Sequence, residues 1–516
     1  MLLLDGPAGV TWARLLDRRL PWFRPAQLTW EDVPDPAAAV AQLEAGGWVD
    51  GLVPAEARLS AFTVPELKAA LARHRLRRGG RRAELVERLL EAGLAPTEPV
   101  RRLARRSLVR RLELLAFESA WRGRKTLLLE RIGVTRHVDH PVTAGPPVFA
   151  RRTDLLSLEQ SLGVETDDPE GELVRIDALP ARPVWLAEVD PRRFRARAVR
   201  HAARELERRG EAARAANLYA GLLERRVGRP ERLAPRLALA LEAAGDPERA
   251  LQACVTWRDR VAPSARPAME RTGRRLARKL GHPWRPLPPL VRPRRRRVWL
   301  PAAERRGPRP LWGDPPLAVE AAVARALSPR VALHGENQIW TTLFGLLLGE
   351  LYWLPVPGML PSPGRSGPRD LGTPAFAEHR AAELGARLQA VRRGELRLAD
   401  RWARWAGRSM RGVRWGLAPV ETLEAFASSL GPGAVAAVLE RLAREGWAAA
   451  RGLPDLAILP GEALRIDAIP ARVGAGALLV EVKGPTDSLS DEQKVWLDVL
   501  TRAGAPVEVW DLRPRG

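Results

Sequence analysis

Three charged side chains near the C-terminal end of the chain have the types and spacing of a metal-dependent phosphodiesterase. Asp455 precedes one short apolar run, and Glu481 and Lys483 end another. Carboxylates bind hard divalent cations, and an ammonium group can stand beside the water that attacks phosphorus. The pattern therefore predicts hydrolysis of a phosphodiester, with Mg²⁺ or Mn²⁺ as the cofactor and no small-molecule cofactor.

Two strands must position these side chains. Residues 456–459 and 478–483 are short apolar runs bounded by Gly, Pro and Asp, a pattern typical of strands. Because residues two apart share a face of a strand, Glu481 and Lys483 should point the same way. If the two strands pair, Asp455 lies near Glu481. A Glu-x-Lys triplet alone is weak evidence, since many strands end this way by chance.

The residues around this trio form a longer motif. It runs Gly-Leu-Pro-Asp up to Asp455, then Val-Glu-Val-Lys-Gly-Pro-Thr-Asp-Ser-Leu-Ser from Val480, and it continues with Gln493 and Trp496. The motif resembles the VRR-NUC branch of the PD-(D/E)xK nucleases and, within that branch, the Fanconi-associated nuclease family. Every fixed position of the family's motif is present.

The resemblance implies a role for each polar residue of the motif. Asp455 and Glu481 would be catalytic and would hold the metal, and the backbone carbonyl of Val482 is a further candidate ligand. Lys483 would orient the attacking water or stabilise the transition state. Gln493, on the following helix, would hydrogen-bond that water or hold Lys483.

A second segment is similar to the same family. His334-Gly-Glu336 precedes an apolar helical run at residues 343–348, as the family's His-Gly-Glu precedes a Leu-x-Gly-Leu-Leu helix. By this resemblance Glu336 is the third metal-binding carboxylate. Without it, Glu336 is only an acid in the first turn of a helix, where the dipole favours it. His334 is expected to be structural or to contact substrate, and Asp370 lies in a family-like Gly-Pro-x-Asp-Leu segment without an assigned role.

The charge balance indicates a polyanionic partner. The chain has 84 Lys and Arg against 61 Asp and Glu, a net charge of +23. Nucleic acid is the simplest partner, and an anionic membrane is the alternative. We expect no membrane association, because the sequence has neither a long apolar run nor the features of a signal peptide. The single cysteine, Cys254, excludes an intramolecular disulfide and fits a cytoplasmic, nucleoid-associated protein of bacterial type.

The chain is long enough for several domains, and we predict a mostly α multidomain protein with a C-terminal α/β PD-(D/E)xK nuclease core. The expected segments are a helical, winged-helix-like unit at 1–58, a SAP-like DNA-binding module with a basic helix at 59–140, a helical tetratricopeptide-like region at 141–280, a Pro/Arg-rich linker at 281–314 and the VRR-NUC nuclease domain at 315–516.

The SAP-like module rests on two short amphipathic helices around a basic loop. Thr63, a following Pro and Glu66 form a helix start of the capping-box type. The alternative is a solvated helical hairpin with a charged loop. A helix at 101–112 would bury a stripe of leucines and present arginines. The candidate DNA-binding residues of both elements are Arg77, Arg78, Arg81, Arg82, Arg105 and Arg106.

The resemblance implies a structure-specific DNA nuclease of the phosphodiesterase I type. Such an enzyme would cut near 5′ flaps, act as a 5′-to-3′ exonuclease and serve DNA repair, including interstrand crosslink repair. Its partners would be 5′ flaps, forks and crosslinked DNA. One alternative is a resolvase-type endonuclease for four-way junctions, and the other is a non-catalytic scaffold that binds DNA structures. The sequence does not identify a protein partner.

Overall fold

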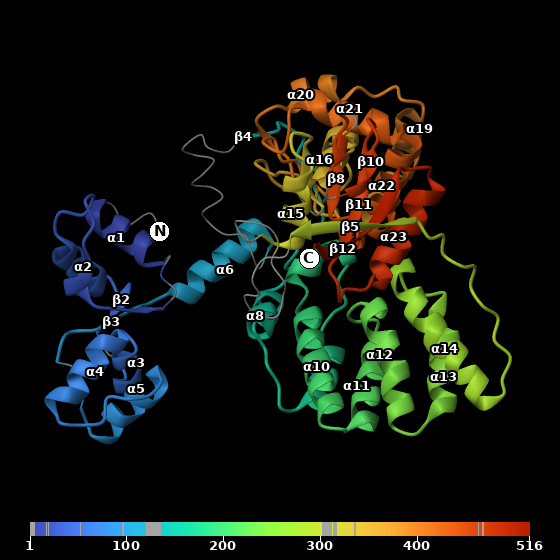
Figure 1. Cartoon of the computed structure of the whole chain (residues 1–516). Coiled ribbons are helices and arrows are strands. Elements are labelled where there is room, and N and C mark those ends of the chain that lie inside the picture. Colours follow the sequence, from blue (N-terminus) through green and yellow to red (C-terminus); the bar gives the residue numbers. More distant parts are fainter. Residues whose placement is uncertain are drawn as a thin grey trace. The chain divides into compact units, whose positions relative to one another are not determined.

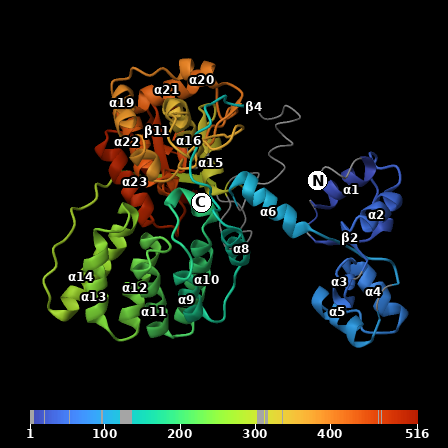
Figure 2. The ribbon, with the colours of Figure 1, turned by 180° about the vertical axis from the view of Figure 1, so that it is seen from behind.

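The computed structural model describes the chain outside a set of short segments, namely residues 1–5, 17, 19, 52, 95–96, 120–135, 302–311, 313–316, 335–336, 463, 467–468 and 516. The described residues form two units, Met1–Phe117 and Glu118–Gly516 (Figure 1). Both are mostly helical, and the C-terminal unit also contains a mixed sheet (Figure 2). This is the predicted fold class.

The N-terminal unit contains two small hydrophobic cores. In the first, two helices pack on an antiparallel sheet of order β1-β3-β2, and in the second, three short helices pack together. The elements are α1 (Gly6–Leu16), β1 (Trp22–Phe23), α2 (Pro36–Ala45), β2 (Val49–Asp50), α3 (Ala55–Leu59), α4 (Val64–Arg73), α5 (Arg82–Glu91), β3 (Arg101–Leu103) and α6 (Arg106–Phe117).

One predicted element of this unit is wrong. The sequence predicts a single helix at 101–112 that buries its leucines, but Leu103 ends strand β3 and lies in the first core. Arg105 has a φ of 55°, in the left-handed region, so the chain turns there before α6 begins. Leu108 and Leu112 of α6 are exposed.

The first half of the C-terminal unit is a stack of antiparallel helices with one shared core. Prolines and aspartates start most of these helices, as expected for first-turn and N-cap positions. The elements are β4 (Arg136–His137), α8 (Arg152–Ser161), α9 (Pro169–Asp177), the 3₁₀ helix Val184–Val189, α10 (Pro191–Arg208), α11 (Ala212–Glu224), α12 (Pro230–Ala243), α13 (Pro247–Arg258) and α14 (Arg266–Leu280).

The second half is built on a five-stranded sheet of order β5-β12-β11-β8-β6. Strands β5, β12 and β11 are parallel, whereas β8 runs antiparallel to both β11 and β6. The strands are β5 (Arg294–Pro301), β6 (Ala332–His334), β8 (Leu456–Ile458), β11 (Leu478–Lys483) and β12 (Val507–Arg515), and a separate hairpin pairs β9 (Leu464–Ile466) with β10 (Ile469–Val473).

Helices cover both faces of this sheet. Val480 and Val482 of β11 face a core that includes α15, while Leu479 faces the larger core of α16, α22 and α23. The helices of this half are α15 (Val319–Ala326), α16 (Gln338–Leu347), α17 (Gly349–Tyr352), α18 (Ala375–Glu378), α19 (Ala381–Arg392), α20 (Leu398–Trp405), α21 (Val420–Leu430), α22 (Pro432–Glu445) and α23 (Asp491–Arg502), with strand β7 (Arg408–Ser409) paired to β4.

Part of the segment expected as a linker belongs to the sheet. Residues 294–301 form β5, which pairs with β12 along its whole length. Arg295 pairs with Asp511, and Arg296 pairs with Glu508 across the two strands. The arginines that suggested a linker therefore lie on an edge strand, where charge discourages pairing with another chain.

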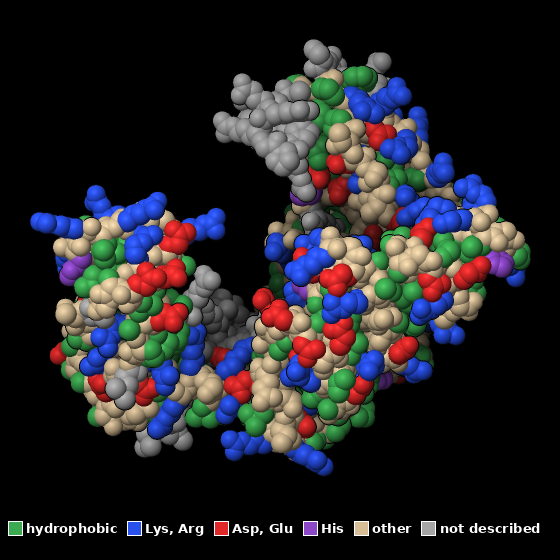
Figure 3. All heavy atoms as spheres, turned by 90° about the horizontal axis from the view of Figure 1, so that it is seen from below, with side chains coloured by type: hydrophobic (Ala, Val, Ile, Leu, Met, Phe, Trp, Pro, Cys, Tyr) green, Lys and Arg blue, Asp and Glu red, His purple; other side chains and the backbone are tan. Residues whose placement is uncertain are grey.

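Among the described residues, no single helix is long and apolar enough to cross a membrane, although α21 and α22, bent by 100°, reach that length together. Viewed from below, Lys and Arg side chains alternate with Asp and Glu over much of the surface (Figure 3). On this face the excess positive charge is dispersed rather than gathered in one patch.

Candidate active site

The sheet brings the predicted acids together. Strands β8 and β11 pair with Leu456 opposite Val480, so Asp455 comes beside Glu481, as the sequence predicts. The backbone N–H of Val482 donates a hydrogen bond of 2.9 Å to Asp455 Oδ2. This bond fixes the Asp455 carboxylate at the end of β11, next to the Glu481 side chain.

Glu481 is fully buried, with an exposed fraction of 0%. Its Oε1 lies 2.8 Å from Lys483 Nζ and accepts a hydrogen bond of 2.5 Å from Gln493 Nε2. Its Oε2 is buried and has no hydrogen-bond partner among the described atoms. Burial, followed by the nearby Asp455 carboxylate, raises the pKa of Glu481 from 4.5 to about 8.

Burial also raises the pKa of Asp455, against the opposing effects of the Val482 N–H and the Lys483 charge. Two adjacent carboxyl groups thus resist ionisation in a desolvated site, and a bound cation would reverse this preference. All the donor atoms are hard oxygens, and Glu481 Oε2 is unpartnered, so the residues fit Mg²⁺ or Mn²⁺.

The described residues do not contain three metal-binding side chains in one cluster. Glu336, the predicted third carboxylate, lies outside the described residues. His334, two positions earlier, ends strand β6 and pairs with Leu456, which follows Asp455. The sequence interpretation missed Glu320, in the first turn of α15, whose charge contributes to the raised pKa of Asp455. Its only signal in the sequence was an acid at a helix start.

Gln493 is held at both ends of its amide. Its Oε1 accepts from the Ser490 N–H at 2.9 Å, and Ser490 Oγ accepts from the Gln493 N–H at 3.2 Å. This capping box starts α23 and aims Gln493 Nε2 at Glu481. Gln493 therefore contacts Glu481 rather than Lys483.

The apolar and Gly positions of the motif fix α23 against the loop that carries Asp455. Gly452 has a φ of 85°, and a Cβ there would lie 2.6 Å from the Glu492 backbone carbonyl carbon. Only glycine allows both the conformation and this approach. Trp496, fully buried, donates a hydrogen bond of 2.6 Å to the Ala449 carbonyl.

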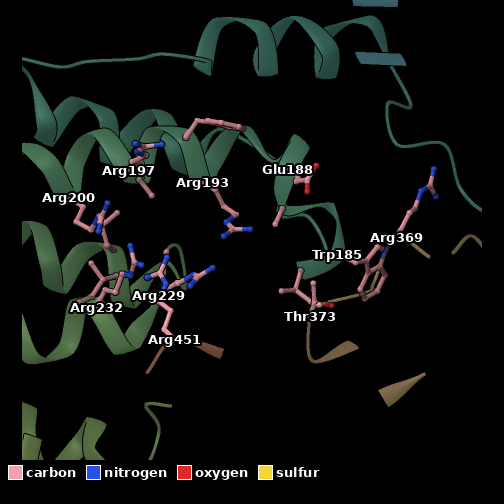
Figure 4. Close-up of a pocket in the computed structure, with 18 of the residues that line it drawn as sticks. Trp185, Glu188, Arg193, Arg197, Arg200, Arg229, Arg232, Arg369, Thr373 and Arg451 are labelled. Carbon is pink, nitrogen blue, oxygen red and sulfur yellow. The ribbon is translucent and has the colours of Figure 1, made fainter. Parts of the chain in front are cut away.

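A second feature of the C-terminal unit is a basic pocket of about 580 Å³. Figure 4 shows arginines converging from α10, from α12 and from the loop before β8. Its charged lining residues are Glu188, Arg193, Arg197, Arg200, Arg229, Arg232, Arg369, Arg411 and Arg451. Burial and neighbouring arginines lower the pKa of Arg200 and Arg232. Such mutual repulsion favours an anion, and Arg451 lies four residues before Asp455.

Asp370 supports one wall of this basic pocket. Its Oδ2 accepts a hydrogen bond of 2.6 Å from Arg380 and lies 2.8 Å from His379 Nδ1. Asp370 and Arg380 are both fully buried. The loop that Asp370 anchors includes Arg369 and Thr373, which line the basic pocket.

The candidate arginines of the N-terminal unit fall into two groups. One group is exposed in the loop between α4 and α5 or at the start of α5, and its members are Arg77, Arg78, Arg81 and Arg82. The other group, Arg105 and Arg106, makes internal contacts, and Arg82 of the first group also donates a hydrogen bond of 2.7 Å to the Ser60 carbonyl. Arg105 lies over the Trp48 ring at 4.6 Å, and Arg106 donates to the Arg18 carbonyl at 2.7 Å.

Comparison with known proteins agrees with this geometry. The SAP domain model matches residues 58–92, and the VRR-NUC domain model matches residues 392–513. The Fanconi-associated nuclease 1 homolog of Pseudomonas aeruginosa is 28% identical over 530 residues, which cover 97% of this chain and 88% of that protein. The Oryza sativa homolog is 34% identical over 183 residues, 35% of this chain. The chain spans only 18% of that longer relative.

Solved structures match over the whole chain. The crystal structure of paFAN1 bound to 2-nt 5′ flap DNA with a gap has a TM-score of 0.78 and 24% identity, and the match covers 100% of this chain and 92% of that one. The complex with 1-nt 5′ flap DNA has a TM-score of 0.76 and 25% identity, with 100% and 93% covered. The two domain matches, the near full-length relative and this shared fold confirm the predicted resemblance. The chain is therefore similar to the Fanconi-associated nuclease family over nearly its whole length.

Proposed function

We propose that this protein is a structure-specific DNA nuclease that hydrolyses phosphodiester bonds with Mg²⁺ or Mn²⁺. The observation that carries the proposal is the desolvated pair of Asp455 and Glu481 beside Lys483. Glu481 is buried, its pKa is about 8, and its Oε2 lacks a partner. A carboxylate pair of this kind is costly to a protein that only binds DNA, because it opposes a polyanion and destabilises the fold.

Each residue has a defined task in this reaction. The metal, when bound, would acidify a water and neutralise charge on the phosphate. Asp455 and Glu481 would hold it, with the Val482 carbonyl as a further ligand and Glu336 as a third carboxylate. Lys483 places a positive charge where negative charge develops in the transition state.

We further propose that the substrate is branched DNA with a 5′ flap. The paFAN1 structures similar to this chain hold 5′ flap DNA. The basic pocket offers a site for a phosphate of the same strand, because Arg451 and Asp455 belong to one short loop. The exposed arginines between α4 and α5 would contact duplex backbone. Exonuclease action from the 5′ end, a role in crosslink repair and association with the nucleoid follow as parts of this proposal.

The test compares Lys483→Ala with a control, Lys494→Ala. Lys494 lies on α23, is 41% exposed and pairs with Asp491. The substrates are 5′-flap, 3′-flap, fork and four-way-junction DNA, labelled at each end, with Mg²⁺ or Mn²⁺. We expect the parental protein and Lys494→Ala to cut the 5′ flap, and Lys483→Ala to bind it but cut at least about 100-fold more slowly.

Parental cleavage rates in Lys483→Ala would overturn the assigned chemistry. Preferred cutting of the four-way junction would identify a resolvase instead. Tight binding without any product from the parental protein would identify a non-catalytic scaffold.

A further inference from the structure

A row of arginines follows one face of α20, outside the active site and the basic pocket. Arg397, Arg401 and Arg404 are spaced by four and three residues, which places them on one side of a helix, and Arg408 follows four residues later in strand β7. Arg397 is the N-cap residue of α20, and Arg408 lies just beyond its end. We call these four residues the α20 ridge.

The ridge carries more positive charge than its acids neutralise. Glu350 of α17 pairs with Arg401 and Arg404 of the ridge and with Arg387 of α19. Burial and the two ridge arginines lower the pKa of Arg387, as expected when several cations share one carboxylate. Arg401 Nε is also buried without a hydrogen-bond partner. The cluster around Glu350 thus retains a local excess of cations that an anion would relieve.

The other acids beside the ridge leave this excess in place. Glu424 of α21 lies 3.8 Å from Arg397, near the limit of an ion pair. Asp400 of α20 is exposed. The charged tips remain open to solvent, since Arg397 and Arg404 are 72% and 57% exposed. An anion could therefore reach them without rearrangement of the helix.

Tryptophan side chains pack against one another and against an arginine of the ridge. Trp402 and Trp415 meet edge to face with ring centroids 4.9 Å apart, and Arg404 lies over Trp405 at 4.8 Å. Trp415 Nε1 donates a hydrogen bond of 2.7 Å to the Arg408 carbonyl. These contacts limit the freedom of the helix and reduce the entropy lost when its arginines bind a ligand.

The shape and chemistry of the ridge favour a nucleic-acid backbone. Arg397 and Arg404 are about 10 Å apart along the helix, a span that covers more than one phosphate of a DNA strand. No large hydrophobic side chain is exposed among the described residues after Val331, so this surface lacks apolar anchors for a membrane or a protein partner. Figures 1 and 2 show α19–α21 at the opposite end of the C-terminal unit from α10–α14.

We propose that the α20 ridge binds the phosphate backbone of the duplex part of the substrate. The inference rests on the proposed function in that the ligand is DNA, but it assigns a binding surface that the catalytic motif does not include. Guanidinium groups in a row bind successive phosphates without reading the base sequence. The ridge would therefore add affinity and salt dependence, and no base preference.

The test is a charge series around Glu350, measured as binding of labelled 5′-flap DNA in Ca²⁺ at several salt concentrations. Arg404→Gln removes one ridge charge and leaves Glu350 paired with Arg387 and Arg401. Glu350→Gln adds one net positive charge. The matched control is Arg393→Gln, because Arg393 is 58% exposed, like Arg404, but donates hydrogen bonds from two of its three guanidinium nitrogens to Glu395.

We expect Arg404→Gln to raise the Kd about three- to tenfold near 0.1 M salt and to lower the salt-dependence slope by about 1. Glu350→Gln should tighten binding and steepen the slope, and Arg393→Gln should change neither. Thermal unfolding of each variant identifies any loss of DNA binding that is caused by misfolding. A purely structural cluster would destabilise the protein in both Glu350→Gln and Arg404→Gln and leave the slope unchanged.

Equal DNA binding by Arg404→Gln and Arg393→Gln, both folded, would overturn the inference. So would weaker binding of Arg404→Gln to anionic phospholipid vesicles with unchanged DNA binding. A third outcome would also overturn it. If millimolar inorganic phosphate removed the Kd difference between Arg404→Gln and the parental protein while the salt-dependence slope of DNA binding stayed the same, the ridge would be a site for free phosphate. If the parental protein cuts no DNA but the charge series still follows the expected order, the ridge inference stands and the nuclease proposal fails.

Discussion

Glu481→Gln should stabilise the metal-free protein. Glu481 is fully buried next to Asp455, and its pKa is raised from 4.5 to about 8. Between these two values the native state keeps a proton that the unfolded chain has released. The free energy of unfolding therefore falls as pH rises through this window, and the effect is absent below about pH 4. Glutamine does not ionise in this window, so the free energy of unfolding of the variant should not fall with it.

The magnitude follows from the pKa difference. At pH 7 the unfolded chain has ionised Glu481 while the native state has not, a difference worth about 3 kcal/mol. In EDTA, urea unfolding should show Glu481→Gln more stable than the parental protein at pH 7. The difference in the free energy of unfolding between the two proteins should narrow to about 1 kcal/mol at pH 5. Glu492→Gln is the control, because Glu492 is an exposed glutamate on α23.

Metal provides the second half of the test. Mg²⁺ should stabilise the parental protein, because cation binding favours the ionised carboxylates, and it should leave Glu481→Gln nearly unchanged. The reasoning is refuted if Glu481→Gln is less stable than the parental protein in EDTA at pH 7. That result would mean that the pairing of Glu481 with Lys483 outweighs the burial of its charge.

Two further substitutions test the supports of the active site and the basic pocket. Gly452→Ala should lower cleavage at least about tenfold and destabilise the fold by about 1–3 kcal/mol, because φ is positive and the new Cβ would meet α23. Cleavage assays should show no such loss in Gly461→Ala, where the nearest atom to a Cβ is 3.6 Å away. Asp370→Asn should cost about 3–5 kcal/mol in urea unfolding, since it leaves the buried Arg380 without a charged partner. If adding Arg380→Met to Asp370→Asn restores stability, the loss comes from this pair. If the double variant loses as much stability as Asp370→Asn alone, it does not.

The parts of the site that local sequence rules govern were predictable. The two-residue period of a strand placed Glu481 and Lys483 on one face, and the antiparallel pairing of β8 with β11 brings Asp455 beside them. The helix start at Ser490 likewise follows from a capping box within four residues. In each case the determining contacts lie close in sequence or follow from strand pairing alone.

The parts that depend on distant contacts were not predictable. Strand β5 begins with four arginines, and its pairing partner β12 begins more than two hundred residues later, so these arginines suggested a linker. The basic pocket draws arginines from α10, α12 and the loop before β8, and no local pattern joins them. Only the fold reveals that Arg295 meets Asp511 whereas Arg200 and Arg232 of the pocket lie among other arginines.

Gln493 shows how geometry separates two roles that one motif permits. The sequence allowed it to bind the attacking water or to hold Lys483. In the structure its carbonyl accepts the Ser490 N–H, and its amide nitrogen donates to Glu481 Oε1. An amide engaged at both ends is poorly placed to take a proton from water. It can instead keep Oε1 of Glu481 occupied, which would leave the unpartnered Oε2 to bind a metal. We therefore expect Gln493 to act on catalysis through the orientation of Glu481, which would join the start of α23 to the chemistry on β11.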